Sequence, residues 1–382
     1  MKVLYDYQAF TLQKFGGVSN TFVQLAKNLP KDVKYDFAVA ESNNIHLQGS
    51  GLVSVPYASQ TDESFITCKP YWGKSKFYRL YSRIFPRYTS LGRNKKYSEE
   101  MLCQGDFDVF HPTFFSDYFL PYLDGKPFVL TVHDMIPERF ADQFRKKDVQ
   151  LSNKKLLVDA SAHIIAVSEK TKEDLMELLH VPETKITVIY HAVPEVVHEF
   201  SRKLVEGSYI LYVGNRFGYK NFIPMMSQLI PILKEHCDLK IVCTGSLFNS
   251  TETKFFMKHG IQDRVIHVSA LDSEMYNLYA HAICFIYPSL YEGFGIPILE
   301  AWQARCPVLL NNKSCFPEIA RDAALYFNLD DQYSNLQRVM DSFLKMDDTQ
   351  KKELIDRQEK RLLEFSWKKS AEQLADVYKM VL

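Results

Sequence analysis

The sequence predicts an α/β protein made of two doubly wound, Rossmann-like domains of similar size. Three observations predict this fold class. Short apolar runs alternate with helical patterns along the chain, as in parallel sheets with crossover helices. The length of 382 residues suits two or three domains. A polar, weakly periodic stretch at Val196–Gly207 separates two such series, so we expect domains at 1–196 and 197–365.

Five apolar runs predict the strands of the first domain. They are Lys2–Tyr5, Val109–Phe110, Phe128–Val132, Ile164–Val167 and Ile186–Ile189. After the pair Gly16–Gly17, apolar residues from Val18 to Leu29 recur at the spacing of one helix face, and Pro30 ends that helix. The first domain is therefore expected to begin with a strand, a glycine-containing turn and a helix.

Five further runs predict the strands of the second domain. They are Tyr209–Val213, Leu239–Cys243, Val265–Val268, Ile283–Tyr287 and Val308–Leu310. A last helical pattern at Trp367–Val381 is too long for a frayed end. We therefore expect a separate C-terminal helix within residues 366–382.

Composition excludes several classes of protein. Lys plus Arg and Asp plus Glu both number 46, so no net charge recruits nucleic acid. The seven cysteines include no CxxC pair, which argues against a disulfide framework or a zinc site and for a reducing compartment. Asp6 interrupts the first apolar run too early for a secretory signal, and no run approaches the ~20 residues of a membrane span. No histidines have metal-ligand spacing. We expect a cytoplasmic protein without a metal ion or cofactor.

The segment Cys68–Tyr97 is rich in basic and aromatic residues. It holds nine Lys or Arg and no Asp or Glu. Such clusters suit the surface of an anionic membrane. The alternatives are a peripheral contact at the inner face of a membrane and an ordinary solvated surface.

The stretch YEGFGIPILEA, Tyr291–Ala301, predicts a ligand-binding turn. It follows an apolar strand, and Pro297 suits the first position of a new helix. Glycines in the turn let the backbone approach a ligand, and the helix start offers N–H groups and partial positive charge. Glu292 and Glu300 could accept hydrogen bonds from hydroxyl groups. The sequence thus predicts a binding site for a phosphorylated, polyhydroxylated molecule. The alternative is that Glu292 is a solvated acid of the loop and Glu300 only complements the helix dipole.

Two cations and one histidine also follow strand ends. Arg216 and Lys220 come after Gly214, so side chains and backbone could meet a phosphate. His133 follows the strand FVLTV, and the carboxyl ends of parallel strands are where open α/β sheets bind ligands. His133 could hydrogen-bond a sugar or assist a hydroxyl group, and its alternative role is structural. Gly17 could let the backbone approach a phosphate in the first turn.

The segment YPSLYEGFGIPILEA resembles the E-x7-E signature of the retaining glycosyltransferases of family 4, which have the GT-B fold. Other segments are similar to the motifs of this family in the same order. They are Gly16–Val18, Val132–Asp134, Ala166–Glu169, Gly214–Asn221, Pro317–Ile319 and Asp322–Ala324. The resemblance covers most of the chain and is stronger in its second half. It implies two Rossmann-like domains facing a cleft, with the last helix packing back on the first domain.

The resemblance implies a role for each site residue. Glu300 would bind the ribose of a nucleotide-sugar donor, and Lys220 would neutralise its diphosphate. Glu292 would hold the transferred sugar together with the backbone of Gly293, Phe294, Gly295 and Ile296. The family most often has arginine where this chain has Tyr219, so Arg216 is the expected substitute. Gly17 and Gly214 would approach the diphosphate, and His133 would serve catalysis.

The resemblance also implies a reaction. A sugar, with mannose and GDP preferred, would pass with retention to a saccharide or lipid-linked acceptor in cell-surface polysaccharide or lipopolysaccharide synthesis, without a metal ion. Cys68–Tyr97 would meet the membrane or that acceptor. The alternatives are a nucleotide-sugar epimerase of the same fold and a non-catalytic subunit that binds a nucleotide-sugar.

Overall fold

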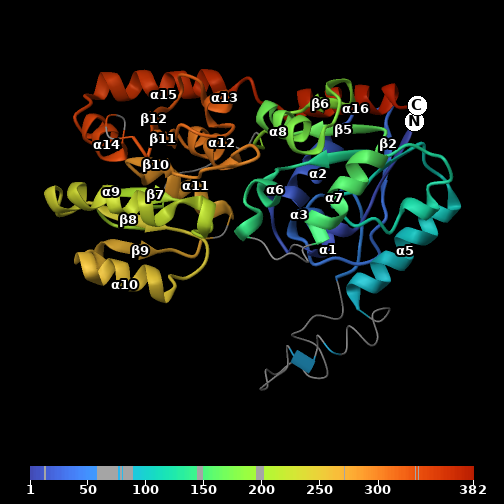
Figure 1. Ribbon diagram of the computed structural model, residues 1–382, viewed down its shortest axis with the longest axis horizontal. Helices are drawn as coiled ribbons and strands as arrows, with labels where there is room; N and C mark the ends of the chain where they lie inside the picture. Colours follow the sequence, from blue (N-terminus) through green and yellow to red (C-terminus); the bar gives the residue numbers. More distant parts are fainter. Residues whose placement is uncertain are drawn as a thin grey trace. The chain divides into compact units, whose positions relative to one another are not determined.

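The computed structural model divides the chain into two compact units (Figure 1). Unit 1 comprises Met1–Val167, Thr171–Tyr190 and Trp367–Leu382, and unit 2 comprises Ser168–Lys170 and His191–Ser366. The structure describes residues 1–12, 14–57, 76–77, 80, 89–143, 149–194, 202–270, 272–331, 333 and 335–382.

Unit 1 is built on parallel strands. Its strands are β1 (Lys2–Tyr5), β2 (Lys34–Phe37), β3 (Val109–His111), β4 (Val129–Val132), β5 (His163–Ala166) and β6 (Ile186–Val188). They form one group in the order β2-β1-β3 and another in the order β4-β5-β6. A parallel bridge between Phe110 and Phe128 joins β3 to the residue before β4. Side chains of β3, β4 and β5 are buried throughout, as expected for parallel strands covered on both faces.

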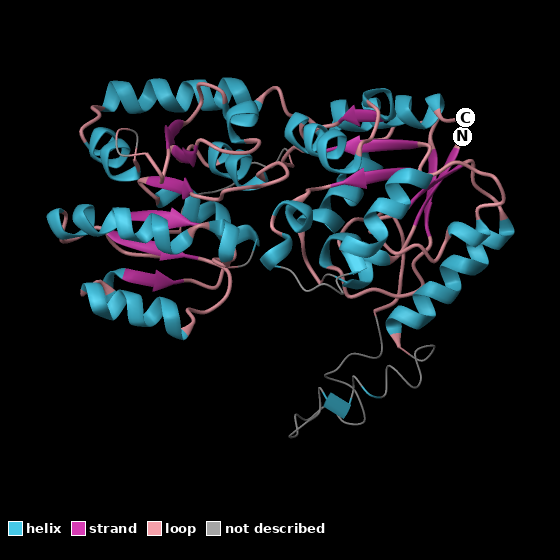
Figure 2. Cartoon of the chain, in the orientation of Figure 1, coloured by secondary structure: helices cyan, strands magenta, loops and turns pink. Residues whose placement is uncertain are grey.

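Helices connect and cover these strands (Figure 2). Those described in unit 1 are α1 (Gln8–Leu12), α2 (Gly17–Asn28), α3 (Ile45–Gln48), α5 (Ser90–Gln104), α6 (Ile136–Arg139), α7 (Val149–Ala160), α8 (Glu169–Leu179, whose first two residues are assigned to unit 2) and α16 (Trp367–Met380). Short 3-10 turns lie at Leu120–Tyr122, Ala141–Gln143 and Glu183–Lys185.

The C-terminal helix α16 packs on α2 within unit 1. Its buried Tyr378 hydroxyl lies 2.9 Å from the Tyr5 hydroxyl and 2.6 Å from Nδ1 of His111. The other ring nitrogen of His111 lies 2.9 Å from the Thr131 hydroxyl. This buried chain of polar contacts joins the last helix to strands β1, β3 and β4.

Unit 2 contains a six-stranded parallel sheet in the order β12-β11-β10-β7-β8-β9. Its strands are β7 (Tyr209–Tyr212), β8 (Lys240–Cys243), β9 (Val265–His267), β10 (Cys284–Tyr287), β11 (Val308–Asn311) and β12 (Leu325–Phe327). Read outward from β7, β8 and β9 follow in chain order on one side and β10, β11 and β12 on the other, which is the doubly wound arrangement of Rossmann folds.

Helices lie on both faces of this sheet. They are α9 (Phe222–Glu235), α10 (Ser250–His259), α11 (Asp272–His281), α12 (Ile296–Gln303), α13 (Phe316–Ala320), α14 (Leu336–Leu344) and α15 (Asp348–Leu362). The turns Gly218–Lys220 and Gln262–Arg264 are 3-10 helices. Helices α9 and α14 pack together in one core with α10, whereas α12 packs on α11 and α15. Because all strands are parallel, each crossover returns the chain to the amino edge of the sheet, and every strand ends at the same carboxyl edge.

The ten strands predicted from apolar runs are all present, and no end differs from the prediction by more than one residue. Two further strands, β2 and β12, were not predicted. Both are at borders of their sheets, where burial is incomplete. In β2, Lys34 is exposed and Tyr35 and Asp36 are half-buried, so the run carries no continuous apolar signal. The boundary between the units follows Tyr190, slightly before the predicted stretch.

Candidate functional site

The carboxyl edge of the unit 2 sheet has a switch point between β7 and β10. These two neighbouring strands lead into loops that depart to opposite sides, because β8 and β9 follow on one side and β11 and β12 on the other. In open α/β sheets, ligands bind outside the strand ends at such a point. The two loops are Val213–Asn221 after β7 and Pro288–Gly295 after β10.

The loop after β10 forms the turn predicted from YEGFGIPILEA. It runs into α12, whose N-cap Gly295 has φ of 93° and whose first turn contains Pro297. A Cβ atom on Gly295 would approach Ile298 to 3.1 Å and Phe316 to 3.3 Å, so both space and backbone conformation favour glycine. The start of α12 is thereby fixed beside the switch point, where its N–H groups suit an anion.

Side chains of the loop after β11 hold the backbone of this turn. The Ser314 hydroxyl donates to the carbonyl of Glu292 at 2.8 Å and accepts from its N–H at 3.2 Å. The buried Cys315 thiol donates to the carbonyls of Glu292 at 3.3 Å and Phe294 at 3.2 Å. Burial raises the pKa of this thiol, which stays protonated and able to donate. The two side chains therefore fix the direction of the turn's peptide groups.

Lys220 and Glu292 form an ion pair across the switch point. Lys220 Nζ lies 2.6 Å from Glu292 Oε1, and the side chains are 18% and 10% exposed. The backbone repeats the link, because the N–H of Leu290 donates to the carbonyl of Tyr219 at 2.8 Å. The Tyr287 hydroxyl is also hydrogen-bonded to Glu292. The pKa of Tyr287 is raised, mainly by burial and to a smaller extent by the charge of this carboxylate. A cation and an acid thus meet on adjacent loops, both reachable by solvent.

Glu300 lies in the middle of α12, about one turn beyond Gly295. Its Oε2 accepts a hydrogen bond of 3.1 Å from the hydroxyl of Tyr279, a buried residue of α11. Burial and the charge of Glu300 raise the pKa of Tyr279, so this phenol remains a donor. Tyr279 orients the carboxylate, which is half-buried.

The loop after β7 touches the loop after β8 through two glycines. A Cβ atom on Gly245, whose φ is 86°, would lie 2.5 Å from the carbonyl oxygen of Gly214. The N–H of Gly214 donates to the Thr244 hydroxyl at 3.3 Å. Only glycine fits at position 245, since both the contact and the backbone conformation exclude a side chain.

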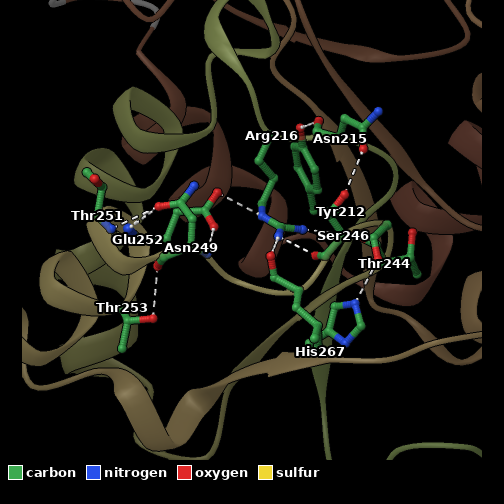
Figure 3. A network of polar contacts seen from close by, with 12 residues as sticks. Tyr212, Asn215, Arg216, Thr244, Ser246, Asn249, Thr251, Glu252, Thr253 and His267 are labelled. Carbon is green, nitrogen blue, oxygen red and sulfur yellow. Dashed lines mark hydrogen bonds and ion pairs between the residues drawn. The ribbon is translucent and has the colours of Figure 1, made fainter. Parts of the chain in front are cut away.

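The expectation that Arg216 stands beside Lys220 as a second phosphate cation is not met. Its side chain is 3% exposed and its Nε lies 2.9 Å from Oε1 of Glu252, which is 5% exposed (Figure 3). Nη1 and Nη2 donate to backbone carbonyls of the loop after β8, including those of Thr244 and Leu247 at 3.0 Å. The guanidinium is therefore engaged by an acid and by backbone carbonyls of unit 2.

Two predicted residues belong to unit 1. Gly17 is the exposed first residue of α2, at the helix N-terminus. His133 follows β4, and its Nε2 is buried. Burial lowers the pKa of His133 to about 4, with nearby Asp134 opposing and Lys154 adding to the shift. Lys154 is itself buried and donates to the Asp134 carbonyl at 3.0 Å, so it holds the loop that carries the histidine.

Comparisons with known proteins identify the family. A family model described as "Glycosyl transferases group 1" matches residues 195–361, and a second, "Glycosyltransferase Family 4", matches residues 15–195. Together the two models span nearly all of the chain, one over each half.

The chain belongs to the family 4, group 1 glycosyltransferases.

Curated relatives of this glycosyltransferase include enzymes named for mannose transfer. The O-antigen chain mannosyltransferase RfbU of Salmonella typhimurium is 30% identical over 206 residues, 54% of this chain and 58% of RfbU. The O-antigen chain mannosyltransferase B of Escherichia coli is 25% identical over 282 residues, 69% of this chain and 73% of that protein. The match to RfbU therefore covers less than two thirds of its length.

Solved structures share the fold of this glycosyltransferase. Anabaena HepE in complex with UDP and glucose has a TM-score of 0.70 at 15% identity, over the whole of both chains. Sucrose-phosphate synthase from Thermosynechococcus elongatus has a TM-score of 0.71 at 15% identity, over 100% of this chain and 98% of that one. The predicted α/β class with two Rossmann-like domains is confirmed.

Most residues predicted for the site gather at one edge of the unit 2 sheet of this glycosyltransferase. They are Gly214, Lys220, Glu292, Gly293, Phe294, Gly295, Ile296 and Glu300. The Phe294 ring is buried against His191 and Phe365, so only its backbone is suited to a ligand. The basic stretch Cys68–Tyr97 lies outside the described residues, except for positions 76, 77, 80 and 89–97.

Sequence reasoning missed the residues that support the site. They are Thr244, Gly245, Glu252, His267, Tyr279, Tyr287, Ser314 and Cys315. Only Glu252 carried a local signal, because Asn249-x-x-Glu252 is a capping-box pattern, and both capping bonds are present. The others act through contacts that the fold creates between different elements and loops of unit 2.

Within the described part of the chain, no group of three or more His, Cys, Asp or Glu could hold a metal ion. None of the helices described there has the length and hydropathy that crossing a membrane requires.

Proposed function

We propose that this glycosyltransferase transfers a sugar, with retention of anomeric configuration, from a nucleoside diphosphate sugar to a saccharide or lipid-linked acceptor. The observation that carries the proposal is the ion pair of Lys220 and Glu292 at the switch point of unit 2, beside the glycine turn that starts α12. A cation suits the diphosphate, and an acid suits sugar hydroxyls.

We assign the donor to unit 2. Lys220 and the N-terminus of α12 stabilise the negative charge that grows on the diphosphate as the bond to the sugar breaks. Gly214, with φ of 106°, lets the backbone of the loop after β7 approach the same phosphates. Glu292 and the peptide groups of Gly293–Ile296 bind the sugar. Glu300 accepts hydrogen bonds from the ribose hydroxyls, oriented by Tyr279.

We propose that the reaction needs no metal ion, because Lys220 and the helix terminus supply positive charge to the diphosphate. Exhaustive dialysis against a chelator should leave sugar transfer unchanged. Loss of transfer that returns on adding a divalent cation would contradict this assignment.

Retention is proposed through attack on the face from which the diphosphate leaves. The bond between the sugar's anomeric carbon and the phosphate oxygen breaks, the acceptor oxygen bonds that carbon, and the acceptor's proton passes to the leaving phosphate. No protein nucleophile is required. Proton NMR of the product formed first, before any mutarotation or further reaction, should show the anomeric configuration of the donor, and an inverted signal would overturn this step.

We propose mannose, carried by GDP, as the transferred sugar, and cell-surface polysaccharide or lipopolysaccharide as the product. The support is the names of the relatives RfbU and O-antigen chain mannosyltransferase B. A thermal-shift panel of nucleotide sugars tests the donor, because a ligand that binds only the folded state raises its melting temperature. The largest shift is expected with GDP-mannose.

We assign the acceptor to unit 1. His133, with a pKa near 4, is neutral at physiological pH and is a weak base. It is therefore suited to accepting a hydrogen bond from a hydroxyl group, not to removing the proton. Gly17, at the N-terminus of α2, offers a backbone site for a phosphate group in the same unit.

We further propose that the protein acts in the cytoplasm and meets anionic membrane peripherally through the basic segment Cys68–Tyr97. Sedimentation with liposomes at low salt tests this contact. Binding to anionic but not to neutral liposomes is expected, and equal sedimentation with both would end the idea.

The alternatives predict different products. An epimerase would convert its nucleotide sugar with no acceptor present, and a non-catalytic subunit would bind the donor tightly without turnover under any acceptor. Transfer of the donor's sugar to an added acceptor, with release of nucleoside diphosphate, excludes both.

A further inference from the structure

The loop between β8 and α10, residues 244–249, is held by side-chain donors from outside it (Figure 3). Arg216 Nη1 donates to the carbonyl of Thr244, and Nη2 donates to those of Ser246 and Leu247. Nε2 of His267 lies 2.8 Å from the carbonyl of Gly245. Four consecutive carbonyl oxygens of the loop, from Thr244 to Leu247, are therefore each engaged by a side chain.

The direction of these carbonyls fixes the direction of the next N–H groups. In a planar trans peptide, the N–H of a residue points opposite to the preceding carbonyl, and the described chain has no cis peptide bond. The N–H groups of Gly245, Leu247 and Phe248 therefore point away from their preceding carbonyls' contacts with Arg216, and the N–H group of Ser246 points away from the contact with His267. None of the four donates to a described residue, and Gly245, Ser246 and Leu247 are exposed.

This row of N–H groups lies next to the proposed donor site. Gly245 packs directly on Gly214, and the Thr244 hydroxyl accepts from the N–H of Gly214. Gly214 lies in the loop after β7 that also carries Lys220. Rows of backbone N–H groups with one direction bind anions and oxygen acceptors.

The side chain of Arg216 is engaged by protein groups on several sides. Its charge is paired with Glu252, and its guanidinium carbon lies 4.8 Å from the centre of the Phe248 ring and 5.6 Å from that of Phe222. Glu252 is fixed in turn, because its Oε2 accepts from the N–H of Asn249 at 2.8 Å. The planar guanidinium donates to three carbonyls at once. The compact ammonium group of a lysine cannot reproduce these contacts.

We propose that Arg216 is a positioning residue, which with Glu252 and His267 turns the carbonyls of Thr244–Leu247 inward so that the N–H groups of Gly245–Phe248 face the nucleoside diphosphate of the donor. The proposal deepens the proposed function and rests on it. The occupant is a phosphate oxygen of that nucleotide, which accepts hydrogen bonds from these N–H groups.

The test compares Arg216→Lys and Glu252→Gln with Arg264→Lys. Arg264 is a matched control, because its Nη1 also donates to backbone carbonyls, those of Leu233 and His236, but at the amino end of β9. The measurements are the dissociation constants of GDP and guanosine by calorimetry, KM for the donor, kcat and thermal stability. Guanosine lacks the phosphates and reports general damage to the site.

Both Arg216→Lys and Glu252→Gln are expected to raise the dissociation constant of GDP and the donor KM at least about tenfold. The dissociation constant of guanosine and kcat at saturating donor should change by less than about threefold. Arg264→Lys should change stability without changing either dissociation constant.

The outcomes separate this proposal from the proposed function. Unchanged GDP binding in Glu252→Gln would mean that the position of Arg216 has no effect on the nucleotide. Tighter GDP binding would mean that Arg216, freed from Glu252, contacts the phosphate directly. Either result would overturn the proposal. Equal weakening of GDP and guanosine would also overturn it, because it would report a structural role only. A wild-type protein that binds no nucleoside diphosphate would instead refute the proposed function.

Discussion

Nζ of Lys220 lies 2.6 Å from Oε1 of Glu292, joining the loops that follow β7 and β10. The strands are neighbours, but the loops depart to opposite sides of the sheet, so the pair spans its switch point. Each side chain retains some exposure. In the proposed function this pair separates when the donor binds, Lys220 turning to the diphosphate and Glu292 to the sugar.

Separate roles for the two partners predict opposite effects on nucleotide binding. Lys220→Met should weaken GDP binding, because a charge-assisted contact worth about 1.5–3 kcal/mol is lost, which is roughly tenfold or more in the dissociation constant. Glu292→Gln should leave GDP binding equal or tighter, since Lys220 loses its competing partner. Calorimetric titration with GDP measures both. Equal weakening by both changes would show that the intact ion pair, and not Lys220 alone, binds the nucleotide.

A ribose contact at Glu300 predicts discrimination between ribonucleotides and deoxyribonucleotides. The wild-type protein should bind GDP at least about tenfold more tightly than 2′-deoxy-GDP. Glu300→Ala should lose this preference by weakening GDP alone. Tyr279→Phe removes the phenol that orients Glu300 and is the matched control, expected to keep most of the preference. The assignment fails if Glu300→Ala still prefers the ribonucleotide as strongly as the wild-type protein does.

The contact between Gly245 and Gly214 predicts a large cost for a single methyl group. Gly245→Ala adds a Cβ atom 2.5 Å from the Gly214 carbonyl oxygen at a φ of 86°. Gly260→Ala is its control, because φ is 67° there and no atom lies within 4 Å of the added Cβ. Urea unfolding should show a loss of about 1–2 kcal/mol for Gly260→Ala and of about 1–3 kcal/mol more for Gly245→Ala. Equal losses would mean that the loops separate without cost.

The buried His111 predicts a loss of stability in acid. Burial lowers its pKa from 6.5 to about 3. Between these pH values the unfolded chain binds a proton at His111 that the folded protein does not bind. The contribution of the neutral His111 to the free energy of unfolding is therefore complete above pH ~6.5 and falls as the pH drops toward ~3. The slope from this group approaches about 1.4 kcal/mol per pH unit.

His111→Asn should flatten the dependence of the unfolding free energy on pH in this window, although the variant is less stable at pH 7. Chemical unfolding at a series of pH values measures the slope. The same change at the exposed His236 controls for removal of a histidine. An unchanged slope in His111→Asn would show that His111 already takes up its proton in the folded protein.

The sequence predicted the strands that are buried and the turn that begins α12, because both have strong local signals. Continuous apolar runs mark strands such as β10, and the Gly-x-Pro order marks the helix start. It missed the border strands β2 and β12, whose burial is incomplete. The expected phosphate role of Arg216 followed from its position near Lys220 in the sequence. In the fold, Arg216 is paired with Glu252, which lies 36 residues further along the chain and has no local sequence link to it.

The supporting contacts of the site could not be predicted for the same reason. Cys315 and Ser314 meet the carbonyl of Glu292 only because β10 and β11 are neighbours in the sheet. Gly245 meets Gly214 because β7 and β8 are neighbours. Strand order places these loops together, and no spacing within one segment encodes it.

The central claim is tested most directly by donor turnover, measured as release of nucleoside diphosphate from the nucleotide sugar that gives the largest thermal shift. The wild-type protein, Lys220→Met, Glu292→Gln and the control Lys240→Met are compared at saturating donor, with and without acceptor. Lys240 begins β8 at the opposite edge of the sheet, where its Nζ donates to the Glu206 carbonyl. We predict a loss of roughly 10²–10³-fold in both site variants and none in the control. Turnover at the wild-type rate in both Lys220→Met and Glu292→Gln would contradict the account.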